Sequence, residues 1–311
     1  MAIDINIGEM GIKEIDAACS GITDALDSGE LKTAFELIQS LAAGVQDFSC
    51  RHRLEELQDT YKYLLHYYAE GLRDPEREQI YADIRTGAYE LADRIGRQAL
   101  LACTRTDYNR SWMYSICRPS VGMDGLVEQL PAQYEREDME PFEASVGQLF
   151  DNVWKTLFLS GDDTVPLREA LASERFPTPA KCQVVSALQL GLLMSFDKEK
   201  LYLLFDAAAV EDPEVRIRAL IAVCLTLYRY RQRTMYYPGI RHRLDALAEA
   251  PDFGRIMRTI VLRFILSRET EKVTHKIREE ILPEMMKLKF TSQGERFGIL
   301  SDFPGDEMNP E

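Results

Sequence analysis

Apolar residues recur along this chain at the three- and four-residue steps that place them on one face of an α-helix. Between residues 54 and 95 the positions that form this stripe are Leu54, Leu57, Tyr61, Leu64, Leu65, Tyr68, Ile80, Ile84, Ala88, Leu91 and Ile95. A half-buried strand would instead alternate apolar and polar residues between turn signals, and the sequence contains no such run. The pattern predicts an all-α protein.

Turn residues divide the helical pattern into segments. Asp74 and Pro75 are typical of a helix start, because Asp can cap free N–H groups and proline at the first helical position has no N–H to lose. The predicted helices cover residues 11–27, 30–43, 52–71, 75–104, 122–135, 141–159, 165–173, 178–195, 198–209, 213–231, 239–249, 252–268 and 270–289. From about residue 290 the stripe stops, and the Gly, Pro and acidic residues there are typical of a tail or linker.

The second half of the chain repeats one arrangement of helices. Residues 201–227 read as an apolar helix, a tight Asp-Pro turn and a second apolar helix, and residues 165–193 and 242–266 follow the same order more loosely. The second helices open near Pro179, Pro213 and Phe253, which gives a period of 34 to 40 residues. One helical hairpin cannot bury its apolar face alone, so the repetition predicts hairpins that stack on their neighbours.

The middle unit carries a recognisable motif. Its residues 212–220, DPEVRIRAL, resemble the HEAT repeat family. In that family an Asp and an Arg of neighbouring units often form a ladder along the array, and the resemblance places this role on Asp212 and Arg216. The preceding unit has Thr178 and Cys182 at the corresponding positions. The ladder implied by the resemblance is therefore interrupted in this sequence.

The first half is similar to a different repeat. Residues 29–42, GELKTAFELIQSLA, resemble one helix of a tetratricopeptide hairpin, although the Trp, Gly and Tyr positions of that motif are absent. The whole chain resembles large bacterial helical-repeat proteins, most of them uncharacterised. These resemblances imply a right-handed α-α superhelix, a solenoid of stacked helical hairpins. We expect a tetratricopeptide-like region over 1–160, HEAT-like repeats over 161–290, and a tail or linker over 291–311.

Composition agrees with a folded helical protein. Of the 311 residues 46% are hydrophobic and 28% are charged, while Gly and Pro are scarce. No secretory signal is visible at the N-terminus, and no apolar run approaches the length of a membrane span. The six cysteines are widely spaced and form no CxxC pair. We therefore expect a reduced, cytoplasmic protein that does not enter a membrane.

The charge is distributed unevenly. The formal net charge is −14, and residues 1–160 account for −13 of it. Residues 213–263, in contrast, contain ten Arg, no Lys and four acidic residues, a net charge of +6. Within them, LTLYRYRQRTMYYPGIRHR (225–243) alternates aromatic rings with guanidinium groups, at the end of one predicted helix and in the connection to the next. This stretch is the candidate site.

Three interpretations of that stretch remain open on the sequence alone. The arginines could cover the carbonyl end of a helix and pair with acidic residues of the N-terminal half. They could form a docking surface for an acidic or aromatic-rich protein segment, because Arg and Tyr are enriched in interface hot spots. They could also bind nucleic acid, although the net charge repels a polyanion. The predicted partner-binding residues are Tyr228, Arg229, Tyr230, Arg231, Arg233, Tyr236, Tyr237, Arg241 and Arg243.

Motifs of the common catalytic classes are missing from the sequence. It contains no GxxxxGK[ST], GxGxxG, GxSxG or HExxH, and its histidines lie far apart. Cys50 and His52 are two residues apart, which points them to different faces of a helix. The sequence predicts no catalytic residue, cofactor or metal, and it favours a non-catalytic protein-protein scaffold or adaptor. An enzyme with a dispersed active site in a helical fold is the alternative, followed by a nucleic-acid-binding helical-repeat protein.

Overall fold

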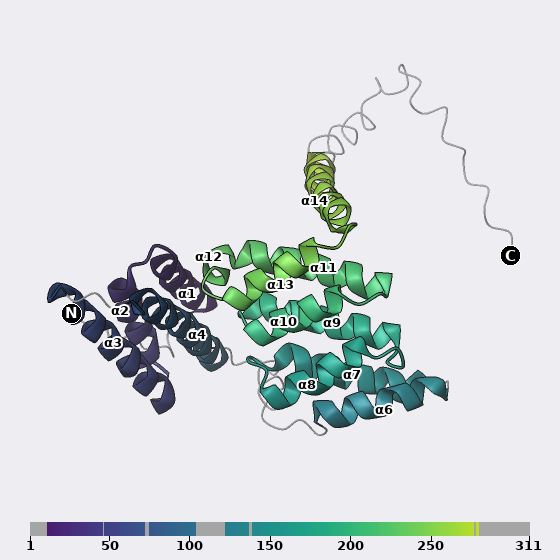
Figure 1. Cartoon of the computed structure of the whole chain (residues 1–311), viewed down its shortest axis with the longest axis horizontal. Helices are drawn as coiled ribbons and strands as arrows, with labels where there is room; N and C mark the ends of the chain where they lie inside the picture. Colours follow the sequence, from purple (N-terminus) through teal and green to yellow (C-terminus); the bar gives the residue numbers. More distant parts are fainter. Residues whose placement is uncertain are drawn as a thin grey trace, which may run out of the picture. The chain divides into compact units, whose positions relative to one another are not determined.

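The computed structural model describes residues 11–45, 47–71, 75–103, 122–136, 139–276 and 278–279. Within these ranges every regular element is a helix and none is a strand (Figure 1). The prediction of an all-α chain is therefore confirmed. The chain divides between Ala250 and Pro251 into two compact units, of which the first contains the helices up to α13 and the second contains α14.

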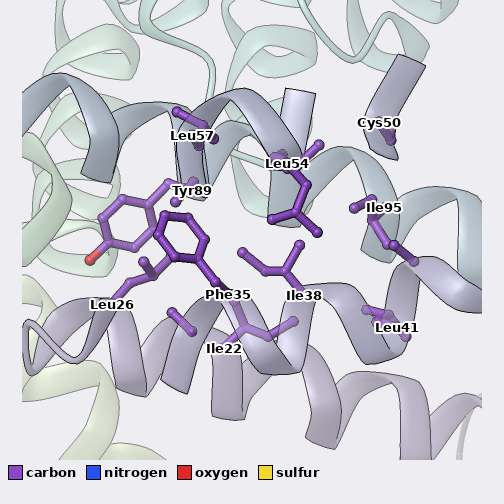
Figure 2. Close-up of a cluster of buried hydrophobic side chains, with 14 of the residues drawn as sticks. Ile22, Leu26, Phe35, Ile38, Leu41, Cys50, Leu54, Leu57, Tyr89 and Ile95 are labelled. Carbon is purple, nitrogen blue, oxygen red and sulfur yellow. The ribbon is translucent and has the colours of Figure 1, made fainter. Parts of the chain in front are cut away.

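Four helices make up the N-terminal part of the first unit. They are α1 (Ile12–Asp27), α2 (Leu31–Ala43), α3 (Phe48–Ala69) and α4 (Arg77–Cys103). The long helix α4 contacts the other three, and α2 lies against both α1 and α3. Figure 2 shows the side chains that meet between them, with Phe35, Ile38 and Leu54 among those at the centre. Most residues of the predicted apolar stripe lie in this core, which drives the packing of these helices, whereas Leu65 and Tyr68 of the stripe are exposed.

A glycine allows α1 and α4 to approach closely. A Cβ atom on Gly96 of α4 would lie 2.6 Å from the Sγ atom of Cys19 in α1, a separation that real Cβ atoms do not adopt. Ile15 and Ile95, which share these two helices, are completely buried. A side chain at position 96 would therefore require Cys19 or the helix backbone to shift.

The rest of the first unit consists of two rows of helices, and each helix contacts the next member of its own row. Its members are α6 (Met123–Glu135), α7 (Met139–Lys155), α8 (Gly161–Ala172), α9 (Thr178–Met194), α10 (Lys198–Ala208), α11 (Pro213–Arg229), α12 (Arg231–Thr234) and α13 (Pro238–Ala248). Helices α6, α8, α10 and α13 contact one another in that order, and α7, α9 and α11 do the same (Figure 1). Contacts of α6 with α7, and of α10 with both α9 and α11, join the two rows.

Local hydrogen bonds explain where the helices differ from the predicted ranges. Helix α8 begins at Gly161 rather than at residue 165, because the hydroxyl of Ser160 accepts the N–H of Asp163 and the Asp163 carboxylate accepts the N–H of Ser160. Helix α14 (Phe253–Lys276) is continuous across residue 269, where two helices were predicted. No proline or glycine interrupts it there, and the Thr270 hydroxyl donates to a carbonyl of its own helix.

The expected boundary at residue 160 falls between helices that touch. Helix α6 contacts α8 and helix α7 contacts α9, so the contacts join residues on the two sides of this position. Residues 291–311, where we expect a tail or linker, lie outside the described residues. Among the helices that the structure describes, none is both long enough and apolar enough to cross a membrane.

Candidate functional site

The arginine- and tyrosine-rich residues 228–243, which we call the Arg/Tyr segment, follow a bent path. Helix α11 ends at Arg229, and Tyr230 leaves the helical conformation, with φ −108° and ψ 28°. The short helix α12 then leads to Tyr237 and α13. The predicted helix over 213–231 thus ends two residues earlier than expected. Arg229 is exposed, whereas the side chain of Arg233 is buried.

Arg233 forms an ion pair with an acidic residue of the N-terminal helices. Its Nη1 atom lies 2.5 Å from an Oδ2 atom of Asp93 in α4, and its side chain is only 4% exposed. Its guanidinium lies 4.4 Å from the ring centre of Phe196 and 5.0 Å from that of Tyr89. Burial alone would lower the pKa of Arg233, but the Asp93 carboxylate raises that pKa above its usual value. The guanidinium therefore stays charged inside the protein.

The tyrosines of the Arg/Tyr segment pack around the same point. The rings of Tyr230 and Tyr237 both contact Phe196, at centroid distances of 5.1 and 5.2 Å. The Tyr230 hydroxyl donates to the carbonyl of Leu192 at 2.6 Å. Burial raises the pKa of Tyr237 to about 12, so its hydroxyl stays protonated. These rings are structural anchors as well as members of the predicted surface.

Tyr236 connects the Arg/Tyr segment to the core of α1–α4. Its ring packs against that core and lies 4.6 Å below the guanidinium of Arg85. Arg85 in turn donates to the carbonyls of Leu26 and Asp27 at the end of α1. Cations are favoured at a helix C-terminus, so this contact joins the end of α1, helix α4 and the Arg/Tyr segment.

Arg243 belongs to a charged row that links successive helices. Its Nη1 atom lies 2.5 Å from one carboxylate oxygen of Asp206, whose other oxygen accepts Arg168 Nε at 2.9 Å. These residues come from α13, α10 and α8, and they are separated by 37 and 38 residues along the chain. The guanidinium of Arg243 also lies 4.7 Å from the ring centre of Tyr202. Sequence analysis did not identify this row, although its spacing equals the repeat period.

Of the two predicted ladder residues, Asp212 has contacts that can be described in detail. Asp212 caps α11 by accepting the N–H groups of Glu214 and Val215. It also accepts the hydroxyl of Thr178, which opens α9, at 2.5 Å. This hydrogen bond is the largest cause of the lowered pKa of Asp212. Asp212 thus contacts the preceding unit through Thr178. Arg216 lies half-buried in α11.

The remaining members of the Arg/Tyr segment face solvent. Tyr228 is 75% exposed, and Arg229, Arg231 and Arg241 are exposed as well. Arg229 lies 5.6 Å from the ring centre of Tyr230, and Arg241 is 3.8 Å from Asp245 within α13. The segment therefore consists of an inner group that ties helices together and an outer group that is available for contact.

A pocket of about 290 Å³ lies where the two groups meet. It is lined by Thr23 and Asp27 of α1, by Tyr89, Ala92 and Asp93 of α4, and by residues 228–233. Five of the predicted partner-binding residues thus share one concave site with the N-terminal helices. The Asp27 carboxylate accepts the hydroxyl of Tyr89. Nε and Nη2 of Arg233 are buried without a hydrogen-bond acceptor among the described residues.

A larger pocket, of about 440 Å³, lies elsewhere in the first unit. It is lined by Cys50, Glu90, Arg94 and Asp197, among others. Burial raises the pKa of the Cys50 thiol to about 11, which keeps it protonated and weakly nucleophilic. Both oxygens of Asp197 accept backbone N–H groups, from Glu199 and Leu159. In the part of the chain that the structure describes, no three His, Cys, Asp or Glu side chains gather as metal ligands.

A buried lysine was not anticipated from the sequence. Lys200 is almost completely buried, and its Nζ atom donates to the carbonyl of Thr156 at 2.5 Å, just beyond the end of α7. Burial lowers the pKa of Lys200 to about 8. A Cβ atom at Gly191 would lie 2.4 Å from this Nζ atom. The spacing of Gly191 and Lys200 carries no motif that would have revealed this contact.

The geometry thus assigns the Arg/Tyr segment both an internal role and an open pocket, without identifying a family. Comparisons with protein-family models, with curated proteins and with solved structures find no match to this chain.

Proposed function

We propose that this chain is a non-catalytic scaffold, built as a right-handed α-α superhelix of tetratricopeptide-like and HEAT-like hairpins. The order of helix contacts supports the proposal, because α6, α8, α10 and α13 follow one another while α7, α9 and α11 form a parallel row. The charged row of Arg168, Asp206 and Arg243 repeats at nearly equal spacing, as contacts between repeat units do.

A cytoplasmic location is part of the same proposal. Cys19, Cys50, Cys182 and Cys224 are free thiols. Free and largely buried thiols are typical of proteins from reducing compartments.

The proposed partner is a protein that presents an acidic segment. The single observation that carries this proposal is the pocket formed by Tyr228, Arg229, Tyr230, Arg231 and Arg233. Arg229 and Arg231 bring exposed positive charge to it, and neither forms an ion pair with a described residue. The exposed ring of Tyr228 adds an apolar surface beside them. Exposed Arg and Tyr beside a concave site are typical of interface hot spots.

The test is binding of the full chain to an array of short peptides of graded acidity. We expect retention to increase with acidic content and to fall about tenfold in an Arg231→Glu variant, because a repulsive charge replaces an attractive one. Arg175→Glu is the matched control. Arg175 is 82% exposed and lies outside the pocket lining, so the same change of charge leaves the pocket intact. Circular dichroism checks that both variants keep their helix content.

Two results would overturn the proposal. Equal retention of acidic and neutral peptides would mean that the arginines do not select the partner. Equal loss of binding in Arg231→Glu and Arg175→Glu would mean that net charge, and not the pocket, attracts the peptides.

A further inference from the structure

The charges that line the Arg/Tyr pocket do not cancel. Its charged side chains are Asp27, Asp93, Arg229, Arg231 and Arg233, which leave one net positive charge. Both carboxylates are already engaged, since Asp93 pairs with Arg233 and Asp27 accepts the hydroxyl of Tyr89. Neither exposed guanidinium forms an ion pair with a described residue, although Arg229 contacts Tyr230. The pocket is thus complementary to a group with one negative charge.

The buried wall of the pocket has unused hydrogen-bond donors. Arg233 uses only Nη1 on Asp93, while Nε and Nη2 are shielded from water and lack an acceptor. The nearby Tyr237 hydroxyl raises the pKa of Arg233, whereas Nε and Nη2 have no hydrogen-bond partner among the described residues. A buried donor without an acceptor costs free energy, and this cost is larger for a charged guanidinium than for a neutral donor. Because these nitrogens are shielded from water, an acceptor in the pocket satisfies them only when the Arg233 side chain turns towards it.

We propose that this pocket binds a single carboxylate of the partner, an Asp or Glu side chain, between the guanidiniums of Arg229 and Arg231, with Arg233 as the inner donor. The inference rests on the proposed function, because that function supplies a protein segment as the source of the carboxylate. A carboxylate accepts the forked donors of a guanidinium at two oxygens, which gives orientation as well as affinity. The exposed ring of Tyr228 at the rim is placed to contact the residue beside the acidic side chain.

Phosphate is the competing oxyanion, and the charge of the site decides against it. A phosphorylated side chain carries a charge between −1.5 and −2, roughly, at neutral pH. One net positive charge would leave part of that charge unbalanced beside Asp27 and Asp93. A carboxylate, with one negative charge, matches the lining.

The experiment follows the arginine Nε–H resonances of the full chain by NMR while sodium acetate or inorganic phosphate is added. Sodium chloride at equal ionic strength serves as the reference, because screening alone changes exposed charges. Single Arg→Lys variants at positions 229, 231 and 233 assign the signals. We expect acetate to shift the signals of Arg229, Arg231 and Arg233 along one saturable curve, and to leave Arg175 unmoved. In an Arg231→Gln variant the acetate affinity should fall about tenfold, because one of the charged donors is lost.

Each outcome decides for or against the carboxylate. Saturation by phosphate at lower concentration than by acetate would overturn the proposal in favour of a phosphorylated partner. An Arg233 signal that neither anion moves beyond the chloride reference would overturn it as well. If acetate saturates the site while acidic peptides are not retained, the carboxylate site stands and the scaffold function fails. If peptides are retained through Arg231 without any response of Arg233, the function stands and this inference fails.

Discussion

Replacement of Arg233 by Met tests the central contact of the first unit. The side chain of Arg233 is 4% exposed and that of Asp93 is 24% exposed, so the change leaves an unpaired carboxylate in a largely dry environment. Loss of one partner from a buried ion pair costs about 3–5 kcal/mol of unfolding free energy. We expect the lower end of that range, about 3 kcal/mol, because Asp93 keeps some access to water and Met can fill the space between the rings of Phe196 and Tyr89.

The assay is urea unfolding of the full chain, followed by circular dichroism, with the m-value checked for a change in the unfolding transition. A second variant separates the ion pair from packing. The double change Arg233→Met and Asp93→Leu removes both charges, and replacement of a buried pair by apolar residues is often close to neutral. We expect the double variant to regain about 2 kcal/mol of the stability that Arg233→Met loses. Additive losses, or a loss below about 1 kcal/mol for Arg233→Met alone, would refute the reasoning.

Three further predictions concern contacts between helices. Between pH 8 and 10.5 the chain should gain stability relative to a Lys200→Met variant, by about 3 kcal/mol at most. The reason is that the pKa of Lys200 is about 8 in the folded chain and 10.5 in the unfolded chain, so only the unfolded chain keeps the proton in this range. Gly191→Ala should lower the thermal midpoint, because the new Cβ would meet Lys200 Nζ at 2.4 Å. Asp206→Asn should cost about 1–2 kcal/mol in urea unfolding, since it weakens partly exposed pairs with Arg168 and Arg243 together.

Each of these has a clear negative result. A flat difference in stability between pH 8 and 10.5 would mean that Lys200 titrates as an exposed lysine does. A Gly191→Ala variant as stable as the parent would contradict the steric argument. So would a destabilisation by Gly191→Ala that is unchanged when Lys200→Met is added. For Asp206, equal stability of the Asn variant and the parent would show that the charged row has no effect on helix stacking.

Local patterns were sufficient to predict most helices. Helix α11 begins at Pro213, as the Asp-Pro signal predicts, since Asp212 caps the free N–H groups and proline donates none. The start of α8 was predicted at residue 165, four residues too late. The local signal was nevertheless present, since Ser160 and Asp163 have the spacing of a capping box.

The candidate site was only partly predictable. The concentration of arginine within 228–243 is visible in the sequence, but the orientation of each side chain depends on a partner far away. Arg233 turns inward to Asp93, which lies 140 residues earlier in the chain, and no periodicity connects the two positions. The row of Arg168, Asp206 and Arg243 was accessible in principle, because its separations of 38 and 37 residues match the repeat period.

Arg233 has two roles at once, since it joins α12 to α4 and also forms part of the pocket wall. A ligand that binds to Nε or Nη2 of Arg233 must therefore change the stability of the contact between α12 and α4. By linkage, the stability of that contact must change the affinity for the ligand. Binding of a partner would then change the rigidity of the helices on either side of the contact between α12 and α4.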